Sequence, residues 1–273
     1  MSDFYLFEAG ATKTAFVHVT KDGCCELLLP PFNPNRKYDA FEIAIHEGID
    51  LLPNKKVIFY GAGLASDENK NIVHQLFSNK SLGGIKVYDD ILGAARATLG
   101  TTPGIVAILG TGGLAAKYDG KKIVKRRGGY GYLIDDLGGG FELGKRFLAL
   151  WLNGDLSIRV DGILKEKLKI EKSTFTKEFY KDPDIGFISN LVPFVLQFED
   201  EPAITQMIKA YFKSFIETQV LPLTKEFEIN EFSMVGSVAF LFYRHITLAA
   251  KDHDLRINQC VQNPIQRLIE FHS

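Results

Sequence analysis

The sequence is poor in features that mark secreted, membrane-spanning or nucleic-acid-binding proteins. Its three cysteines, two of them adjacent at Cys24 and Cys25, form neither a disulfide framework nor a metal-ligand spacing. No apolar run approaches the roughly 20 residues that span a bilayer, and no basic segment opens the chain. A net charge of −1 favours neither nucleic acid nor an anionic membrane as a partner. We therefore expect a soluble, cytoplasmic protein with reduced thiols.

The bulk composition is that of a globular protein. Hydrophobic residues make up 46% and charged residues 24% of the chain. A length of 273 residues suggests about two domains and allows a large core without disulfides or structural metals.

The first hundred residues alternate between strand and helix patterns. Such alternation predicts a largely parallel sheet with functional sites at the carboxyl ends of its strands. The expected strands cover residues 4–7, 14–20, 25–29, 55–60 and 85–88, and the expected helices cover 38–52, 68–77 and 91–99.

The same order then recurs. A strand over 105–109 leads into a Gly-Thr-Gly-Gly loop, a returning strand, a turn at Asp119-Gly120 and a strand over 122–125. This recurrence predicts two related α/β lobes that face each other across a cleft. The second lobe then becomes mainly helical, with amphipathic segments near residues 141–152, 185–198, 204–227, 238–250 and 265–272.

Two glycine–threonine loops stand at corresponding points of these lobes, over residues 8–14 and 110–113. Small side chains let backbone N–H groups approach a phosphate, and a threonine hydroxyl adds a donor. Either loop alone is equally typical of an ordinary hairpin, which uses glycine for its turn geometry. Their paired placement predicts two phosphate-binding loops.

Two other glycine-rich segments resemble nucleotide motifs but lack essential residues. Residues 139–146 approach a P-loop but end in Lys145-Arg146, where a magnesium-binding serine or threonine is required. Residues 61–66 lack the third glycine of a dinucleotide fingerprint. We interpret the second segment as close packing between a strand and a helix.

Two pairs of aspartates are candidates for chemistry. Asp89 and Asp90 lie where a strand ends and a helix begins, so we expect one to cap the helix and the other to face the cleft. Phosphoryl transfer to a hydroxyl group uses a carboxylate there as a general base. Asp135 and Asp136 precede three glycines and form a second candidate pair. The basic stretch over 121–127 is interpreted as a solvated strand face, and the six histidines show no ligand spacing.

Taken together, these segments resemble the N-acetylglucosamine kinases and their relatives among the BadF/BadG/BcrA/BcrD-type ATPases. The resemblance covers nearly the whole chain, and the ordered set is more specific than any single piece. The sharpest matches are residues 10–14, 90–97, 108–112 and 235–239, and weaker ones are 33–34, 129–136 and 264–272.

The resemblance implies an ASKHA fold, the two-lobed actin-like ATPase (ribonuclease H-like) α/β fold, with ATP and Mg²⁺ in an interlobe cleft. It places the catalytic aspartate at Asp90 and a magnesium-holding carboxylate at Glu8. It implies lobes over 1–102 and 103–261, with a terminal helix over 262–273 folded back onto the first. The implied nucleotide-binding residues are Gly10, Ala11, Thr12, Lys13, Thr14, Gly110, Thr111, Gly112, Gly236 and Ser237, and the implied sugar contacts are Asn33, Thr111 and Asp136.

This chain departs from the family pattern at three places. Glu8 stands where the family usually has aspartate, and Leu114 stands where it usually has an asparagine that reads the sugar. Leu137 replaces the glutamate of a Gly-Asp-Glu-Gly-Ser segment. We therefore expect a weak magnesium dependence or a low rate, and weaker binding of N-acetylglucosamine.

The expected function is that of an ATP-dependent kinase that phosphorylates an amino sugar, N-acetylglucosamine or glucosamine. The expected partner is this small molecule rather than nucleic acid or membrane. The sequence leaves open whether the chain forms a homodimer. One alternative is a degenerate family member that binds nucleotide or sugar as a sensor or partner-binding protein, with little turnover. A third reading is an ATPase that couples lobe closure to another protein's chemistry.

Overall fold

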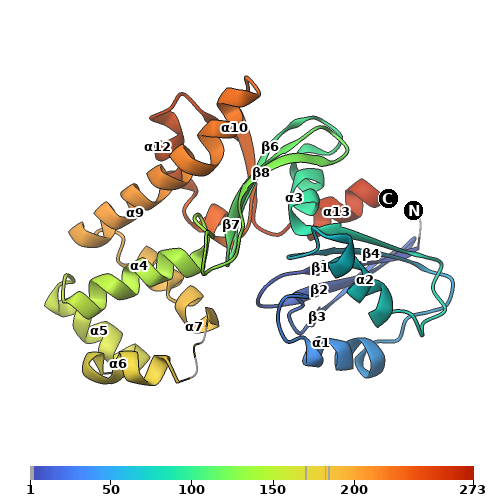
Figure 1. Cartoon of the computed structure of the whole chain (residues 1–273), viewed down its shortest axis with the longest axis horizontal. Helices are drawn as coiled ribbons and strands as arrows, with labels where there is room; N and C mark the ends of the chain where they lie inside the picture. The colour runs from blue at the N-terminus through green and yellow to red at the C-terminus, as the bar shows by residue number, and fades with distance from the viewer. Residues whose placement is uncertain (1–2, 170, 182, 184) are drawn as a thin grey trace. The chain divides into compact units, whose positions relative to one another are not determined.

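The computed structural model describes residues 3–169, 171–181, 183 and 185–273, which divide into two compact units (Figure 1). The first unit comprises the chain up to Pro103 together with Tyr118–Ile123 and Asn263–Ser273, and the second comprises Gly104–Lys117 and Val124–Gln262. The lobe bounds implied by the resemblance stay a prediction. Within the described residues, none of the helices has the length and apolarity needed to cross a bilayer.

The first unit is built on a five-stranded sheet in the order β3-β2-β1-β4-β5. β1 pairs with β2 antiparallel and with β4 parallel, and β4 pairs with β5 parallel, so the sheet is mixed. The strands are β1 (Phe4–Ala9), β2 (Thr14–Thr20), β3 (Gly23–Leu29), β4 (Lys56–Gly61) and β5 (Ile85–Asp89).

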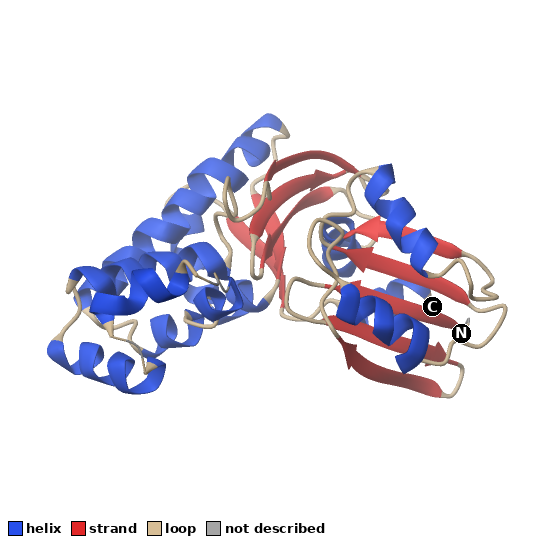
Figure 2. Cartoon of the chain, turned by 60° about the horizontal axis from the view of Figure 1, so that its bottom comes forward, coloured by secondary structure: helices blue, strands red, loops and turns tan. Residues whose placement is uncertain are grey.

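Helices cover both faces of this sheet (Figure 2). Alternate residues of β1 point to opposite faces, so Tyr5 and Phe7 pack with α1 and α2 while Phe4 and Leu6 pack with α13. The helical segments are α1 (Asp39–Ile43), the π-helical turn η1 (Ala44–Gly48), α2 (Asp67–Leu76), α3 (Asp90–Leu99) and α13 (Ile265–His272).

The second unit repeats the topology of the first. Its sheet has the order β8-β7-β6-β9-β10, which is the order β3-β2-β1-β4-β5 with each strand replaced by its counterpart. This repetition confirms the predicted pair of related α/β lobes. The strands are β6 (Gly104–Leu109), β7 (Gly113–Tyr118), β8 (Ile123–Gly128), β9 (Glu231–Val235) and β10 (Arg256–Val261).

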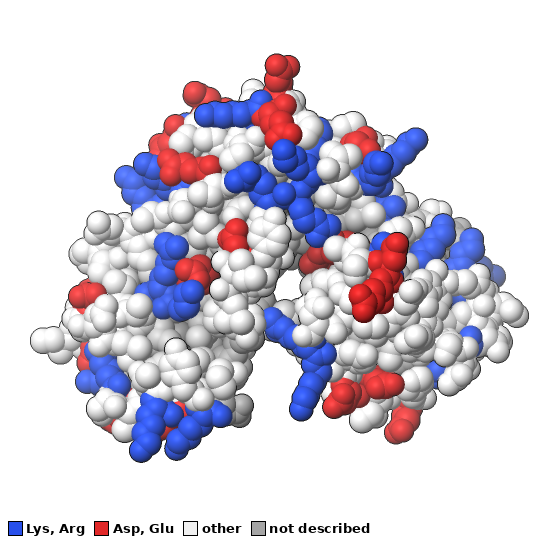
Figure 3. All heavy atoms as spheres, viewed as in Figure 1, with Lys and Arg blue, Asp and Glu red and all other residues white. Residues whose placement is uncertain are grey.

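A large helical layer packs on the second sheet and shares one apolar core with β6. Acidic and basic side chains are interspersed on the face of the chain drawn in Figure 3. The helices are α4 (Gly140–Asn153), α5 (Ile158–Leu168), α6 (Lys172–Phe179), α7 (Ile185–Ser189), α8 (Val192–Gln197), α9 (Pro202–Phe215), η2 (Ile216–Val220), α10 (Leu221–Glu226), α11 (Ser237–Leu241) and α12 (Tyr243–Lys251).

Several predicted helices differ from the observed ones for local reasons. The helix expected over 38–52 ends at Gly48, because the backbone is already extended at Ile49. The segment over 185–198 is two helices, and the second begins at Val192 with Pro193 in its first turn, where proline is tolerated. The segment over 204–227 contains the π-helical turn η2 and Pro222. The sequence patterns missed α5, α6, β9 and β10.

Candidate functional site

In the first unit, the carboxyl ends of three parallel strands lie in register. Ala9 of β1 pairs with Gly61 of β4, which pairs with Asp89 of β5, so Asp90 and Gly10 both lie one residue beyond the same row. Gly61 makes this row tight, because a Cβ there would lie 2.9 Å from Leu64 and 3.3 Å from Ala9. Gly61 therefore serves close packing, but against its own loop and the neighbouring strand rather than against a helix.

Glu8, Asp89 and Asp90 bring three carboxyl groups to this edge. Burial, followed by the charge of Asp89 and a hydrogen bond with its carboxyl, raises the pKa of Asp90 well above its usual range. The Glu8 carboxylate contributes in the same direction, and the Ile91 N–H, which donates to Asp90 Oδ1 at 2.8 Å, opposes it. Burial likewise raises the pKa of Glu8, against the charge of Lys13. The charges of Asp89 and Glu8 therefore both affect the pKa of Asp90.

The expected helix cap by one of the two aspartates is not observed, and the cleft-facing role of the other stays a prediction. Asp89 occupies the N-cap position of α3, but its side chain makes no capping hydrogen bond to that helix. Asp90 is the first residue of the helix, and its carboxylate accepts the N–H of its own neighbour Ile91.

The first glycine–threonine loop is a short hairpin turn closed by one hydrogen bond, from Gly10 N–H to the Lys13 carbonyl at 2.9 Å. Thr12 and Lys13 are exposed, and Ala11 is half-buried. Thr14 is fully buried at the start of β2, and its hydroxyl has no hydrogen-bond partner among the described residues. A buried hydroxyl without a partner is costly unless something else satisfies it.

Asn33 lies beside the loop that follows β4. Its Oδ1 accepts the Asn35 N–H at 2.9 Å, and a Cβ on Gly63 would lie 2.9 Å from that same oxygen. Gly63 has φ +79°, a conformation that favours glycine. Asn69 of α2 completes the arrangement by donating to the Gly63 carbonyl at 2.8 Å and to Asn35 at 3.3 Å.

In the second unit, the loop Gly110–Gly113 is braced by the start of α4. The N–H groups of Gly140 and Phe141 donate to the carbonyls of Gly110 and Thr111, at 2.7 and 3.0 Å. The packing leaves no space for a side chain at position 113, since a Cβ on Gly113 would lie 2.2 Å from the Leu137 carbonyl oxygen.

Asp136 lies against this loop. A Cβ on Gly112 would approach its Oδ2 to 2.8 Å, so the Asp136 carboxylate occupies the space next to Gly112. Gly110 differs, because a Cβ there would meet nothing within 4 Å. The internal packing of the protein therefore gives no steric reason for a glycine at position 110, whereas a side chain at Gly112 would displace the Asp136 carboxylate and one at Gly113 would collide with backbone.

Gly236 joins the same end of the second sheet. It follows β9 with φ +124°, and a Cβ there would lie 2.3 Å from the Leu109 carbonyl oxygen and 3.1 Å from the Gly110 nitrogen. Ser237 begins α11 next to it. The structure thus brings together the segments around Gly110–Gly113, Asp136–Gly140 and Gly236-Ser237 within the second unit. It likewise brings together Glu8, Gly10–Thr14 and Asp90 within the first.

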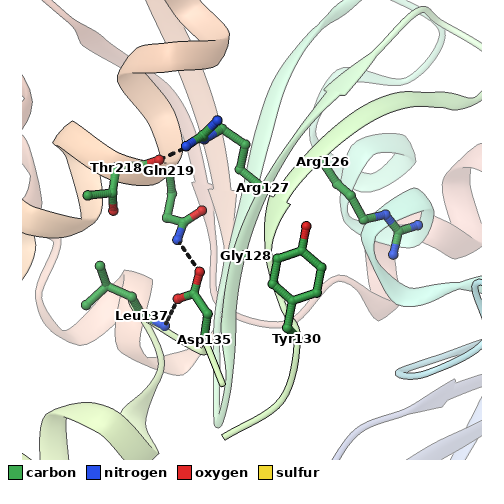
Figure 4. Close-up of a pocket in the computed structure, with 8 residues that line it drawn as sticks. All are labelled: Arg126, Arg127, Gly128, Tyr130, Asp135, Leu137, Thr218 and Gln219. Atoms are coloured by element: carbon green, nitrogen blue, oxygen red, sulfur yellow. Dashed lines mark hydrogen bonds between the residues drawn. The ribbon is translucent and has the colours of Figure 1, made fainter. Parts of the chain in front are cut away.

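A pocket of about 390 Å³ lies beside Asp135 (Figure 4). Asp135 Oδ2 accepts from Gln219 Nε2 at 2.9 Å, and Oδ1 accepts the Leu137 N–H at 3.3 Å. Asp135 therefore holds its own loop through the Leu137 N–H and links it to η2 through Gln219. Asp136 instead lies against Gly112. The pocket is lined by Arg126, Arg127, Gly128, Tyr130, Asp135, Leu137, Thr218 and Gln219.

The two leucines that depart from the family pattern both lie in this region. Leu114 is half-buried and packs against Gly129, where a Cβ would lie 3.1 Å from the leucine Cβ. Leu137 lines the pocket and packs against the apolar core of the second unit.

The basic stretch forms β8, whose Lys125 and Arg126 are exposed as expected of a solvated strand face.

Sequence reasoning missed Tyr211 and Gln219, which hold the loop around Asp136. Tyr211 is fully buried on α9, and its hydroxyl accepts the Gly138 N–H at 2.8 Å and donates to the Gly139 carbonyl at 2.7 Å. Both residues fall within an apolar helical pattern, where a tyrosine or glutamine gives no signal of a long-range backbone contact.

Comparison with known proteins gives one curated relative and several solved structures, while no family model matches the chain. Over 199 residues the chain is 27% identical to the N-acetyl-D-glucosamine kinase of Dictyostelium discoideum. The matched segment covers 64% of this chain and 61% of that kinase, so the chain spans less than two thirds of the relative's length.

The solved structures are more similar in shape than in sequence. A candidate N-acetylglucosamine kinase from Porphyromonas gingivalis matches with a TM-score of 0.88 at 24% identity, covering 98% of both chains. A candidate N-acetylglucosamine kinase from Chromobacterium violaceum matches with a TM-score of 0.73 at 17% identity, covering 100% of both. A ROK family glucokinase from Streptomyces griseus, solved with glucose and AMPPNP, matches at 0.60 and 15%, covering 96% of this chain and 94% of that one. The chain therefore shares the fold of these structures, the actin-like ATPase fold that the resemblance implied.

Proposed function

We propose that the chain is an ATP-dependent sugar kinase that phosphorylates an amino sugar, with N-acetylglucosamine and glucosamine as the first candidates. The observation that carries the proposal is the half-buried Asp90, at the carboxyl edge of parallel strands, where Asp90 and Gly10 both lie one residue beyond the row Ala9–Gly61–Asp89. A general base works best when its pKa lies near the working pH, so a raised carboxyl pKa suits this task. The fold shared with N-acetylglucosamine kinases supports the same assignment.

Two features of the glycine–threonine loops fit the phosphates of ATP. The open space next to Gly110 would admit a ligand close to the backbone, where N–H groups other than that of Gly110, which donates to the Gly112 carbonyl at 3.0 Å, could donate to phosphate oxygens. In the other loop, the Thr14 hydroxyl has no hydrogen-bond partner among the described residues, but it is buried and would reach a phosphate only if the turn shifts. Gly236 and Ser237, at the end of β9 beside Gly110, would bind the adenosine part.

The carboxyl groups of the first unit would suit a hydrated Mg²⁺. Within the described part of the chain, no three histidine, cysteine or acidic side chains are arranged to hold a metal ion by themselves. Mg²⁺ commonly uses one or two carboxylates and keeps waters and phosphate oxygens as its other ligands, which Glu8 could satisfy. When bound, the ion would neutralise charge on the phosphates.

In the proposed reaction, Asp90 accepts the proton of a sugar hydroxyl as that oxygen attacks the terminal phosphorus of ATP. The bond from that phosphorus to the bridging oxygen breaks, and ADP leaves with the electron pair. Asp136, which lies against Gly112, and Asn33, beside Gly63, would hold the sugar hydroxyls. Thr111 belongs to the same loop as Gly112 and would contribute to both the sugar and the phosphate contacts.

The test is a coupled assay of ADP release with N-acetylglucosamine and glucosamine, followed by mass measurement of the sugar product. We expect sugar-dependent ADP release and a product heavier by one phosphoryl group. ATP binding by calorimetry without sugar-dependent turnover would contradict the kinase and favour the sensor reading. ADP release that is equally fast without sugar would instead favour an ATPase.

A further inference from the structure

Three side chains on one side of α9 and η2 contact the segment that carries Asp136. Tyr211 bonds to the N–H of Gly138 and the carbonyl of Gly139, at 2.8 and 2.7 Å. The ring of Phe215 fills the space next to Gly138, where a Cβ would lie 2.6 Å from it. Gln219 donates to Asp135 at 2.9 Å. These three residues recur every four positions and so lie in one row along the helix.

The π-helical turn η2 is tied to the sheet at the end of this row. Pro222 has no N–H, so the Thr218 carbonyl lacks the donor that an α-helix would place four residues later. Arg127 of β8 donates its Nε–H to that carbonyl at 2.8 Å instead (Figure 4). The end of the row is thus anchored to the edge strand of the second sheet.

The segment held by this row packs directly against the backbone of the second glycine–threonine loop. A Cβ on Gly139 would lie 2.4 Å from the Gly112 carbonyl carbon and 2.5 Å from the Thr111 oxygen. The Gly139 N–H also donates to the Asp136 carbonyl at 3.0 Å. With backbone packed on backbone, a shift of Gly138-Gly139 cannot be absorbed by side-chain rearrangement and must move the loop or Asp136.

We infer that Tyr211, supported by Phe215 and Gln219, is a positioning residue that sets the distance between Asp136 and the loop Gly110–Gly113. The inference rests on the proposed function for its consequence in turnover, because that loop and Asp136 are the proposed phosphate and sugar contacts. Complete burial makes the hydroxyl effective, since water has no access to replace its two bonds. Burial also raises the pKa of Tyr211, which keeps its proton available to the Gly139 carbonyl.

The first readout is amide hydrogen exchange in Tyr211→Phe. Removal of the hydroxyl leaves the Gly138 N–H without its acceptor, so we expect exchange of residues 138–141 and 110–112 to speed up about tenfold or more. The matched control is Tyr118→Phe, which removes a buried hydroxyl that donates to two backbone carbonyls of the first unit, those of Gly100 and Gly120. That control should leave exchange at 110–112 and 138–141 unchanged.

The second readout is turnover with the sugar substrate. A displacement of about 1 Å in a positioning group can cost about 100-fold in rate, so Tyr211→Phe should lower kcat ten- to hundredfold while Tyr118→Phe does not. Gln219→Leu, which keeps the side-chain volume, should show a smaller change of the same kind and serves if Tyr211→Phe does not fold. Exchange and kcat equal to those of Tyr118→Phe in both variants would overturn the inference. Absence of sugar phosphorylation by the wild type would refute the proposed function only, because the exchange experiment would still decide the positioning role.

Discussion

The two units carry similar glycine–threonine loops at the same point of the same topology, but they support them differently. In the first unit the loop is a hairpin turn with a single internal hydrogen bond, and its surroundings are acidic, with Glu8 and Asp90 close by. In the second unit the loop also has an internal hydrogen bond, from the Gly110 N–H to the Gly112 carbonyl at 3.0 Å, but it is held in addition by backbone from Leu137 to Phe141 and by Gly236, and the Asp136 carboxylate lies at Gly112.

This difference suggests that the units do different parts of one task. Under the proposed function, the first unit would supply carboxyl groups that take up a proton or a cation, and the second would supply a phosphate loop held in place by backbone packing. Substitutions in the first should therefore act mainly on the rate, and substitutions in the second mainly on ligand affinity. The following experiments test this division.

The largest effect is expected at Asp90. Asp90→Asn keeps the size of the side chain but removes the base, so turnover should fall about 10²- to 10⁴-fold while ATP affinity stays near that of the wild type. The measurements are kcat by ADP release and ATP affinity by calorimetry. Asp89→Asn is the matched control, and if it abolishes turnover while Asp90→Asn does not, the base is the neighbouring residue.

Glu8→Asp tests whether the acidic edge is adapted to the longer side chain. Aspartate is shorter by one carbon–carbon bond, about 1.5 Å. If the Glu8 carboxylate displaces a metal site suited to aspartate by about 1 Å, the substitution should raise activity by up to about 100-fold and strengthen the magnesium dependence. The measurement is a magnesium titration of kcat in both proteins. Lower activity in Glu8→Asp would mean that the site is built around glutamate.

In the second unit, Gly110→Ala is the cleanest test of phosphate binding. The new methyl group would meet no protein atom within 4 Å, so the fold should be unaffected while the space proposed for phosphate is reduced. Loss of one or two charge-assisted hydrogen bonds should weaken ATP binding roughly 10- to 100-fold. Gly112 is unsuitable for this test, because any side chain there displaces Asp136.

Gly162→Ala provides the control for that experiment. Gly162 lies in α5, and a methyl group there also meets nothing within 4 Å. It should stabilise the helix by about 0.5–1 kcal/mol and leave ATP affinity unchanged. Unchanged ATP affinity in Gly110→Ala as well would remove that loop from the nucleotide site.

Leu114→Asn should restore a hydrogen bond to the sugar and tighten N-acetylglucosamine binding. A polar group left facing leucine costs about 1–3 kcal/mol, so the gain should be about tenfold. The side chain is half-buried against Gly129, which leaves room for an amide of similar size. Titration of the sugar into wild type, Leu114→Asn and the exposed control Leu248→Asn decides the point. Tight binding by the wild type, or no gain in Leu114→Asn, would show that other contacts read the sugar.

The sequence predicted the parts of this architecture that depend on local pattern. Both glycine–threonine loops, the placement of Asp90 at a strand end and the repeated lobe follow from turn residues and apolar periodicity. The contacts between remote segments could not be predicted that way. Gly138 needs its glycine because of the Phe215 ring, and Gly113 needs its glycine because of the Leu137 carbonyl. Tyr211 looks like any aromatic residue on a buried helix face until the fold brings Gly138 to its hydroxyl.

The last expected effect is on stability rather than on activity, and it separates the two units by pH. In the first unit, Arg96 Nη1 donates to the Tyr60 hydroxyl at 2.7 Å, which in turn contacts His272 Nε2 of α13 at 2.7 Å. Burial, and then the charges of Arg96 and Lys86, lower the pKa of His272 from 6.5 to about 4. His272 is therefore neutral in the fold at neutral pH and can accept the hydrogen bond of Tyr60.

Acidification should consequently loosen α13 before it affects the second unit. Below pH 6.5 the unfolded chain gains a proton at His272 that the folded chain does not bind until about pH 4, so stability falls across this window. Because α13 is terminal and can detach locally, we expect a loss of roughly 1–3 kcal/mol. Hydrogen exchange of residues 265–272 between pH 7 and 4 measures this loss of local stability. In His272→Phe the local stability of α13 should depend less on pH over this range. An equally steep pH dependence in His272→Phe would assign the acid sensitivity to other groups of the first unit; Glu8 and Asp90 cannot supply it, because a carboxyl whose pKa is raised in the fold stabilises the fold on acidification.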